Sequence, residues 1–495
     1  MSDVFLKVTG IKKSFGGVQA LKGVDLEIKK GEVRSLAGEN GCGKSTLIKV
    51  ISGAHSADAG EVVIDGKRYD SLTPMDAICA GIQVIYQDFA VFPNLTVAEN
   101  IALNYELDTC QKTVNWKEVK EIAQKAMARI GAEIPLDVLV ERLSVANKQM
   151  VAICRALLND AKLVIMDEPT TALTAREVAR LFDVIRMMQE NGIAVMIVTH
   201  KLDEVYEIAE TLTILRNGEK VAEGPINEFD RPRFIKSMTG RDIEEVFYRP
   251  EQNDNKILEV QGISREGAFQ DVTFDLYEGD VLGITGLLGS GRGEIGEALF
   301  GMAPATSGSI KMGGQEIKIK SVGDAMKNGV GYVPEDRLTE GLFLELPIGT
   351  NTIAASVKSY LHGGRLDYKA MNESMWKWIK DLSVAAPSPE PPIKTLSGGN
   401  QQKVVLAKWL NTKPRLLILN GPTVGVDIGS KTDIHKILRG LVADGVGVIV
   451  ISDDLPELIQ NCNRVLIMRG GKLAGCFETT DLDETKLSAL LSEQA

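Results

Sequence analysis

Short apolar runs separated by polar segments recur along this chain and predict the buried strands of a parallel sheet. In the first half the runs are four to six residues long: Val33–Ala37, Ile82–Tyr86, Leu163–Met166 and Ala194–Thr199. Runs of this length are typical of strands that are covered on both faces. Helical segments such as Thr46–Ile51 lie between them. The alternation predicts an α/β fold with a mostly parallel sheet between helices.

The pattern occurs twice, so the chain is a tandem repeat. Leu6-Lys7-Val8-Thr9-Gly10-Ile11 returns as Leu258-Glu259-Val260-Gln261-Gly262-Ile263. Further matches pair Gly38–Ser45 with Gly286–Gly293, Gly60–Gly66 with Gly308–Gly314, and Leu143–Asn147 with Leu396–Asn400. Each half has about 240 residues, a normal size for one α/β domain. We therefore expect domains at residues 1–242 and 257–495, joined by a polar linker at 243–256.

The loop after the first apolar run carries the most specific chemistry in the sequence. It reads Gly38-Glu39-Asn40-Gly41-Cys42-Gly43-Lys44-Ser45, and a helix begins at Thr46. Glycines let backbone N–H groups surround phosphate oxygens, Lys44 can reach the β- and γ-phosphates, and the Ser45 hydroxyl can ligate Mg²⁺. The positive end of the helix favours an anion at the same place. The sequence predicts a nucleotide-binding P-loop.

Polar residues follow three of the other apolar runs. Asp167 and Glu168 end one run in the manner of a Walker B motif. Asp167 can hold Mg²⁺ through its water, and Glu168 can orient the water that attacks the γ-phosphate. Gln87 and His200 end two further runs, and we expect His200 to contact the γ-phosphate. This set predicts nucleotide hydrolysis rather than binding alone.

The segment Leu396-Ser397-Gly398-Gly399-Asn400-Gln401-Gln402 resembles the signature sequence of ATP-binding-cassette (ABC) ATPases, and the resemblance covers nearly the whole chain. It implies that Ser397 and the N–H groups of the next residues, Gly398, Gly399 and Asn400, cap the γ-phosphate held by the opposite cassette. The physical basis is again a helix N-terminus, because Gln401–Leu410 reads as a helix. The resemblance also implies an antiparallel β-subdomain near each amino end and a helical subdomain at roughly 90–160 and 340–408.

The second half departs from this chemistry in its own P-loop. Arg292 replaces the lysine, and Gly293 replaces the serine and removes a Mg²⁺ ligand. The run Leu416–Leu419 ends in Asn420-Gly421, so both Walker B carboxylates are missing. Glu335 stands at the place of Gln87, and Asp453 at that of His200. We expect no hydrolysis at this P-loop.

The signature sequences differ in the opposite sense. In Leu143-Ser144-Val145-Ala146-Asn147, Val145 and Ala146 replace the glycines and hinder close approach to a phosphate. In the family, each nucleotide lies between one cassette's P-loop and the other's signature. The expectation is one competent composite site, from the first P-loop and the second signature, and one degenerate site.

Fused cassettes with Gly291-Arg292 and Pro334-Glu335-Asp336-Arg337 resemble the ATPase subunit of bacterial monosaccharide ABC importers. This resemblance implies ATP and Mg²⁺ as cofactors, with Ser45, Gln87 and Asp167 as metal ligands. It assigns catalysis to Lys44, Gln87, Glu168 and His200, and adenine stacking to Phe15. The implied partners are a membrane permease dimer and a periplasmic or lipid-anchored sugar-binding protein. Nucleoside importers are the nearest alternative, and soluble tandem ABC proteins such as translation factors, repair ATPases or non-hydrolysing regulators form another.

Composition narrows the setting. A net charge of −11 argues against a broad nucleic-acid surface. The six cysteines show no Cys-x-x-Cys spacing, so we expect neither a zinc site nor a disulfide framework. No apolar run approaches the roughly 18 residues that span a bilayer, and Met1-Ser2-Asp3 does not begin a secretory signal. We expect a peripheral protein on the cytoplasmic face of a bacterial cell membrane.

Overall fold

The computed structural model describes residues 3–86, 91–109, 114–158, 160–170, 173, 175–199, 201–242, 247–249, 254–287 and 289–492. The chain divides into two compact units, Met1–Ile243 and Glu244–Ala495. Each unit has its own sheets and its own buried core.

The first unit contains two sheets. Its strands are β1 (Val4–Phe15), β2 (Val18–Lys29), β3 (Val33–Ala37), β4 (Ala59–Ile64), β5 (Lys67–Tyr69), β6 (Ile82–Ile85), β7 (Leu163–Asp167), β8 (Ala194–Val198), β9 (Thr211–Arg216) and β10 (Glu219–Pro225). Strands β2-β1-β4-β5 form an antiparallel sheet. The other sheet has the order β10-β9-β3-β8-β7-β6 and is parallel except for β10.

Helices complete the first unit. They are α1 (Lys44–Ile51), α2 (Pro74–Cys79), α3 (Val97–Thr109), α4 (Trp116–Arg129), α5 (Val145–Leu158), α6 (Ala175–Glu190), α7 (Leu202–Ile208) and α8 (Arg231–Thr239). Local sequence sets several of their starts. Thr73, for example, caps α2 by accepting a hydrogen bond from the Asp76 N–H at 3.2 Å, and Pro74 fits the first turn.

The second unit repeats this plan. Its main strands are β11 (Lys256–Arg265), β12 (Phe269–Tyr277), β13 (Val281–Gly286), β14 (Ser307–Met312), β15 (Gln315–Ile317), β16 (Val330–Val333), β19 (Leu416–Asn420), β20 (Gly447–Ile451), β21 (Arg464–Arg469) and β22 (Lys472–Glu478). The antiparallel order is β12-β11-β14-β15, and the mostly parallel order is β16-β19-β20-β13-β21-β22. Strands β17 (Leu361–His362) and β18 (Arg365–Leu366) form a small hairpin.

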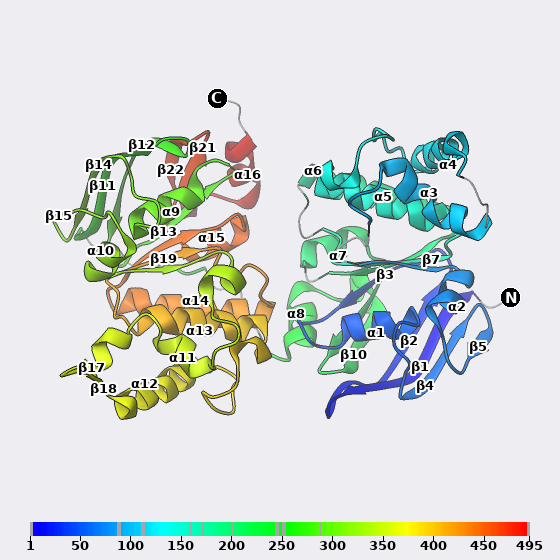
Figure 1. Ribbon diagram of the computed structural model, residues 1–495, viewed down its shortest axis with the longest axis horizontal. Helices are drawn as coiled ribbons and strands as arrows, with labels where there is room; N and C mark the ends of the chain where they lie inside the picture. Colours follow the sequence, from blue (N-terminus) through cyan, green and yellow to red (C-terminus); the bar gives the residue numbers. More distant parts are fainter. Residues whose placement is uncertain are drawn as a thin grey trace. The chain divides into compact units, whose positions relative to one another are not determined.

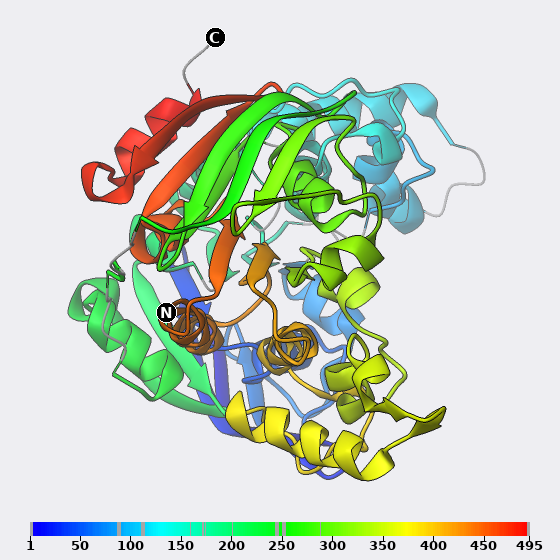
Figure 2. The same cartoon turned by 90° about the vertical axis from the view of Figure 1, so that its left-hand side faces the viewer.

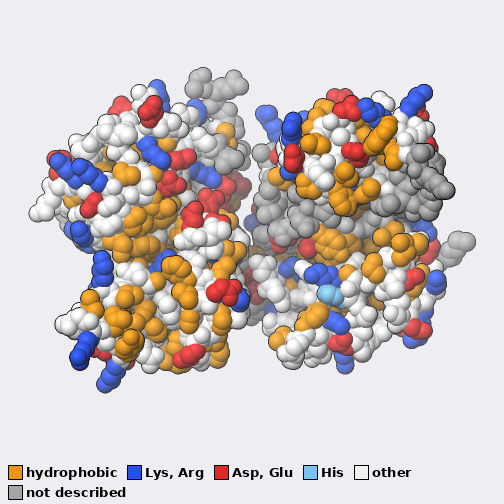
Figure 3. Space-filling view, viewed as in Figure 1, with side chains coloured by type: hydrophobic (Ala, Val, Ile, Leu, Met, Phe, Trp, Pro, Cys, Tyr) orange, Lys and Arg blue, Asp and Glu red, His pale blue; other side chains and the backbone are white. Residues whose placement is uncertain are grey.

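The helices of the second unit are α9 (Arg292–Phe300), α10 (Val322–Lys327), α11 (Ile348–Ile353), α12 (Tyr368–Asp381), α13 (Gly398–Leu410), α14 (Ile428–Ala443), α15 (Leu455–Asn461) and α16 (Glu484–Ser492). Within this unit, the antiparallel sheet lies at one end and α11–α13 at the other, with the parallel sheet between them (Figures 1 and 2). Hydrophobic side chains also show at the surface of the helical end (Figure 3). Separately, Trp376 and Tyr368 of α12 are exposed.

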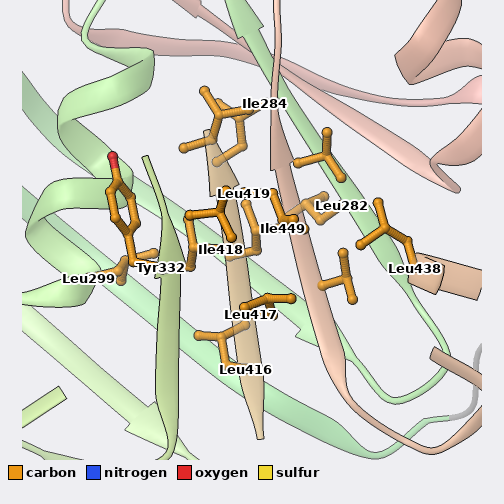
Figure 4. Packing of buried hydrophobic residues seen from close by; sticks show 14 of the residues in the cluster. Leu282, Ile284, Leu299, Tyr332, Leu416, Leu417, Ile418, Leu419, Leu438 and Ile449 are labelled. Carbon is orange, nitrogen blue, oxygen red and sulfur yellow. The ribbon is translucent and has the colours of Figure 1, made fainter. Parts of the chain in front are cut away.

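The core of the second unit explains why its strands read as continuous apolar runs. Leu417 and Leu419 of β19 are fully buried, as are Leu282 of β13 and Ile449 of β20. Helices α9 and α14 cover opposite faces of these strands, as the positions of Leu299 and Leu438 show (Figure 4). Both faces of each strand are therefore shielded from water. The strand sequences are apolar throughout, without the alternation of apolar and polar residues seen in a strand with one exposed face.

The predicted fold class is confirmed. Each unit combines a mostly parallel sheet with an antiparallel sheet near its amino end and a helical segment, α3–α5 in the first and α11–α13 in the second. The observed strands match the apolar runs to within one or two residues. The helix expected through Gln401–Leu410 is α13, which starts at Gly398, so the signature glycines form its first turn.

Candidate functional site

The P-loop of the first unit connects β3 to α1 through two tightly packed glycines. Gly43 has φ of 110°, and a Cβ there would lie 2.7 Å from the Ala20 carbonyl oxygen. A Cβ on Gly38 would lie 2.3 Å from the carbonyl oxygen of Leu215. Neither position can carry a side chain without moving backbone. The loop therefore keeps its N–H groups accessible where α1 begins.

Lys44 lies inside this loop. Its Nζ donates hydrogen bonds to the carbonyl oxygens of Gly38 at 2.7 Å and Glu39 at 2.9 Å, and the residue is 7% exposed. The ammonium group is thus held at the loop by carbonyls that a phosphate can replace. Cys42 is buried beside it, and burial raises the pKa of its thiol, so the side chain behaves as a small neutral residue.

The structure brings together two of the predicted metal ligands. Asp167 is the last residue of β7 and accepts a hydrogen bond from the Ser45 hydroxyl at the start of α1. Burial raises the pKa of the Asp167 carboxyl, and the neighbouring Glu168 charge raises it further. A half-buried carboxylate next to a hydroxyl and a phosphate loop fits Mg²⁺, a hard cation that prefers oxygen ligands. The third predicted ligand, Gln87, lies outside the described residues.

Glu168 adopts an unusual backbone conformation. Its φ is +48°, in the left-handed region that non-glycine residues rarely occupy, and its N–H donates to the Val198 carbonyl oxygen at 2.9 Å. The residue is therefore tied to the end of β8, the strand that leads into His200. Such strain is often kept where a side chain must point in one direction. His200 itself lies outside the described residues.

Phe15 occupies the end of β1. Its side chain is 44% exposed and contacts His55 edge-to-face, with ring centroids 5.3 Å apart. An exposed ring is accessible for stacking. In the second unit the corresponding hairpin is shorter: its strands pair only as far as Arg265 and Phe269, whereas in the first unit the pairing continues beyond Lys13 and Leu21 to Phe15 and Val18. The hairpin of the second unit contains no aromatic residue between its paired ends.

The second P-loop keeps a cation in contact with the loop but has different residues at the metal-ligand positions. Arg292 Nη1 donates to the Gly286 carbonyl oxygen at 2.7 Å, as Lys44 does to Gly38. Its Nη2 lies 3.3 Å from Oδ2 of Asp453, the residue at the place of His200. Asn420 donates to the Tyr332 hydroxyl at 3.3 Å, and burial raises the pKa of that tyrosine to about 12, so the hydroxyl stays protonated. No carboxylate stands at the place of Asp167.

The signature of the second unit is shaped by the neighbouring helix α14. A Cβ on Gly399 would lie 1.9 Å from Ser430 Oγ, so only glycine fits. Ser397 is the N-cap of α13, its hydroxyl accepts a hydrogen bond from Asn400 Nδ2 at 2.8 Å, and it makes no cap bond to the helix backbone. The first-turn N–H groups of α13 therefore lack a side-chain cap, as an anion-binding helix end requires.

The first unit uses its signature serine differently. Ser144 Oγ accepts a hydrogen bond from the N–H of Asn147 at 3.3 Å, so the serine caps the N-terminus of α5. Val145 and Ala146 follow as the first residues of that helix. In the second unit Asp427 caps α14 by accepting hydrogen bonds from the N–H and hydroxyl of Ser430.

Sequence analysis missed a largely buried glutamate beside the motifs of each unit. Glu204 of α7 and Glu457 of α15 accept hydrogen bonds from hydroxyls that flank the motifs. The signal was present in the repeat, since each glutamate lies four residues after the residue at the His200 or Asp453 position.

The fold and these loops define a tandem P-loop nucleotide-binding protein. The model of the ABC transporter family matches residues 21–171 and 269–424, and the chain belongs to this family. Within the part of the chain that the structure describes, no helix has both the length and the apolar content needed to cross a bilayer.

Relatives match along the full length. The chain is 39% identical to the ribose import ATP-binding protein RbsA 2 of Streptomyces avermitilis, over 99% of this chain and 97% of the relative. It is 38% identical to RbsA of Bacillus licheniformis (98% and 99%) and 40% identical to RbsA 3 of Rubrobacter xylanophilus (98% and 98%), both also ribose import ATP-binding proteins. A solved cassette of an ABC transporter in its ADP conformation is 28% identical, with a TM-score of 0.44, covering 48% of this chain and all of that one.

Proposed function

We propose that this chain is the ATP-hydrolysing subunit of a bacterial ABC importer for a monosaccharide. One composite site, made of the first unit's P-loop and Walker B residues and the second unit's signature, carries out hydrolysis. The other pairing is degenerate. Three full-length relatives are named as ribose import proteins, which supports a sugar as the transported solute.

The observation that carries this proposal is the contrast between two equivalent pairs of residues. In the first unit a hydroxyl and a carboxylate, Ser45 and Asp167, meet beside the phosphate loop. In the second unit Gly293 and Asn420 stand at these places and supply neither. Mg²⁺ bound at the first pair would neutralise phosphate charge. A second unit without these oxygens cannot hold the ion in the same way.

Each residue of the competent site then has a distinct task. Lys44 exchanges its loop carbonyls for phosphate oxygens, and Phe15 stacks on adenine. Glu168 orients the attacking water, and His200 holds the γ-phosphate in line with it. Ser397, with the uncapped N–H groups that follow it, neutralises charge on the transferring group. Most of the acceleration is positioning and electrostatic stabilisation, because phosphoryl transfer needs little covalent chemistry from the protein.

The partners follow from the transport role. A permease dimer would receive the conformational change, and a periplasmic or lipid-anchored sugar-binding protein would deliver the solute. The chain itself would sit as a peripheral subunit at the cytoplasmic face of the membrane, with no nucleic-acid partner. Its net charge of −11 is consistent with the last point.

Two measurements test the proposal. The first is affinity purification of the full-length chain from detergent-solubilised membranes. A co-purifying permease supports the importer, whereas a ribosome or no partner contradicts it. The second is calorimetric binding of ribose, galactose and nucleosides to the solute-binding protein encoded with that permease. Binding of a nucleoside in place of a sugar would replace the monosaccharide by the alternative solute.

A further inference from the structure

Glu204 connects two loops of the first unit that flank the proposed catalytic residues. Its Oε2 accepts hydrogen bonds from Thr170 Oγ1 at 2.6 Å and from Thr199 Oγ1 at 3.0 Å. Its Oε1 lies 3.1 Å from Lys201 Nζ, which also donates to the Thr170 carbonyl oxygen at 3.2 Å. Both threonines are at most 3% exposed, and the glutamate side chain is 11% exposed.

The positions of these threonines give the contact its meaning. Thr170 comes two residues after Glu168, and Thr199 comes immediately before His200. The backbone hydrogen bond from the Glu168 N–H to the Val198 carbonyl oxygen joins the same two segments at the ends of β7 and β8. The loop after β7 and the end of β8 are thus tied at two places, once through backbone and once through the Glu204 carboxylate.

The second unit builds the same connection around Glu457. Its Oε1 accepts from Thr423 Oγ1 at 2.9 Å and its Oε2 from Ser452 Oγ at 2.8 Å. The Gly421 N–H donates to the Ile451 carbonyl oxygen at 2.8 Å, as Glu168 does to Val198. There the tied segments carry Gly421 and Asp453 in place of the proposed catalytic residues. The second unit therefore serves as an internal control: it has the glutamate connection but lacks the residues that we propose to be catalytic.

We propose that Glu204 is a positioning residue that ties the loop carrying Glu168 to Thr199, the residue next to His200 in the sequence. This inference rests on the hydrolytic roles proposed above for those two residues. In this proposal Glu204 acts indirectly, through the two threonines. It holds the threonines beside them, so that the residue orienting the water and the residue contacting the γ-phosphate keep one relative placement.

Physical chemistry favours a carboxylate for this task. A single ionised oxygen can accept two short hydroxyl hydrogen bonds, and charge-assisted bonds are stronger than neutral ones. A glutamine at the same place can offer its single amide oxygen to both hydroxyls, but that oxygen is neutral and the attraction to Lys201 is lost. Both hydroxyl bonds would then be weaker, and the loops could separate. A displacement of about 1 Å in catalytic groups is enough to cost up to about a hundredfold in rate.

The test compares Glu204→Gln with Glu457→Gln in the full-length chain. Both variants weaken a carboxylate connection between the corresponding segments, so both should lower the thermal midpoint, Glu457→Gln at least as much because that carboxylate also lies 2.9 Å from His435 Nε2. Only Glu204→Gln should lower the kcat of steady-state ATP hydrolysis, by about tenfold or more, while KM for ATP changes less than about threefold. Glu457→Gln should keep kcat within about twofold of the unchanged protein. Equal loss of kcat in both variants, or in neither, overturns the positioning role.

A second pair of variants guards against misfolding. Thr199→Val removes one tied hydroxyl with little change in volume and should lower kcat in the same way. Thr199→Ser, which copies Ser452 of the second unit, should recover most of the loss. Failure of serine to recover activity contradicts the hydrogen-bonding role. Unchanged turnover in Glu168→Gln would contradict the proposed hydrolytic roles themselves. The Glu204 and Thr199 variants test only the positioning role, so the two failures are distinguishable.

Discussion

Arg292 and Asp453 form an ion pair in the second unit, with Nη2 and Oδ2 3.3 Å apart. These residues stand at the repeat positions of Lys44 and His200, so two positions that we propose to contact phosphate in the first unit carry residues that neutralise each other in the second. Asp453 is 70% exposed, and such pairs are worth only about 0.2–1 kcal/mol. The pair therefore contributes little to the stability of the second unit. It places a negative charge beside the arginine of the second P-loop, so a phosphate would compete with Asp453 for Arg292.

The first prediction concerns Glu168. Glu168→Gln should abolish steady-state ATP hydrolysis while leaving ATP binding intact, because water orientation is lost and the phosphate loop is unchanged. The check is turnover together with nucleotide affinity, measured on the transporter complex. A variant that retains more than about a few per cent of the original rate would show that another group orients the water.

The second prediction compares the two signature serines. Ser397→Arg should be as damaging to turnover as Lys44→Ala, because it places a long side chain against the uncapped end of α13. Ser144→Arg should be much milder, since that serine caps its own helix and belongs to the degenerate pairing. ATP hydrolysis by the three variants measures this. Comparable losses from both serine substitutions would mean that the degenerate site takes a direct part in the cycle.

The third prediction restores the second P-loop. Gly293→Thr should fit, because a Cβ there meets only Asn420 Nδ2 at 3.6 Å. Asn420→Asp adds the missing carboxylate, so the two together should improve Mg-ATP binding at this site. Gly421→Glu is harder to accommodate, since its Cβ would lie 2.9 Å from Val424 at φ of +58°. Even the triple variant should not hydrolyse ATP there, because Asp453 and Val145-Ala146 remain.

Bound nucleotide per chain gives the readout for this restoration. The measurement uses the Glu168→Gln background trapped with Mg-ATP, with and without the added substitutions, and identifies what is released. We expect bound nucleotide to rise on restoration and to be released as ATP. Stoichiometric ADP formed in the unrestored second site would overturn the proposal of one competent site.

The fourth prediction tests why the signature contains glycine. Gly399→Ala should lower the thermal midpoint of the protein, because the added methyl group would collide with Ser430 Oγ at 1.9 Å. Gly440→Ala in α14 is the matched control, with no atom within 4 Å of the added Cβ. It should be neutral or stabilising by up to about 1 kcal/mol, since alanine favours a helix over glycine. Differential scanning calorimetry of both variants compares them. An equal effect would show that α14 yields to the methyl group.

The sequence by itself determined the class of fold and the inequality of the two units. Short apolar runs specify strands that are buried on both faces, and the P-loop residues Gly38–Ser45 have few other uses in a strand–loop–helix context. Arg292, Gly293 and Asn420 can be compared with their counterparts by repeat alone. These features are local, because each depends on a few consecutive residues and the chemistry of their side chains.

Only the tertiary structure decided which distant groups meet. The Ser45–Asp167 hydrogen bond, the Arg292–Asp453 pair and the clash that makes Gly399 obligatory each join segments far apart in the chain. Glu204 reads in the sequence as one more charge on a short helix, and becomes a connector only when β7 and β8 lie side by side. The physical reason is that hydrogen bonds and steric contacts depend on distances set by the packing of the whole sheet. Local pattern does not encode those distances.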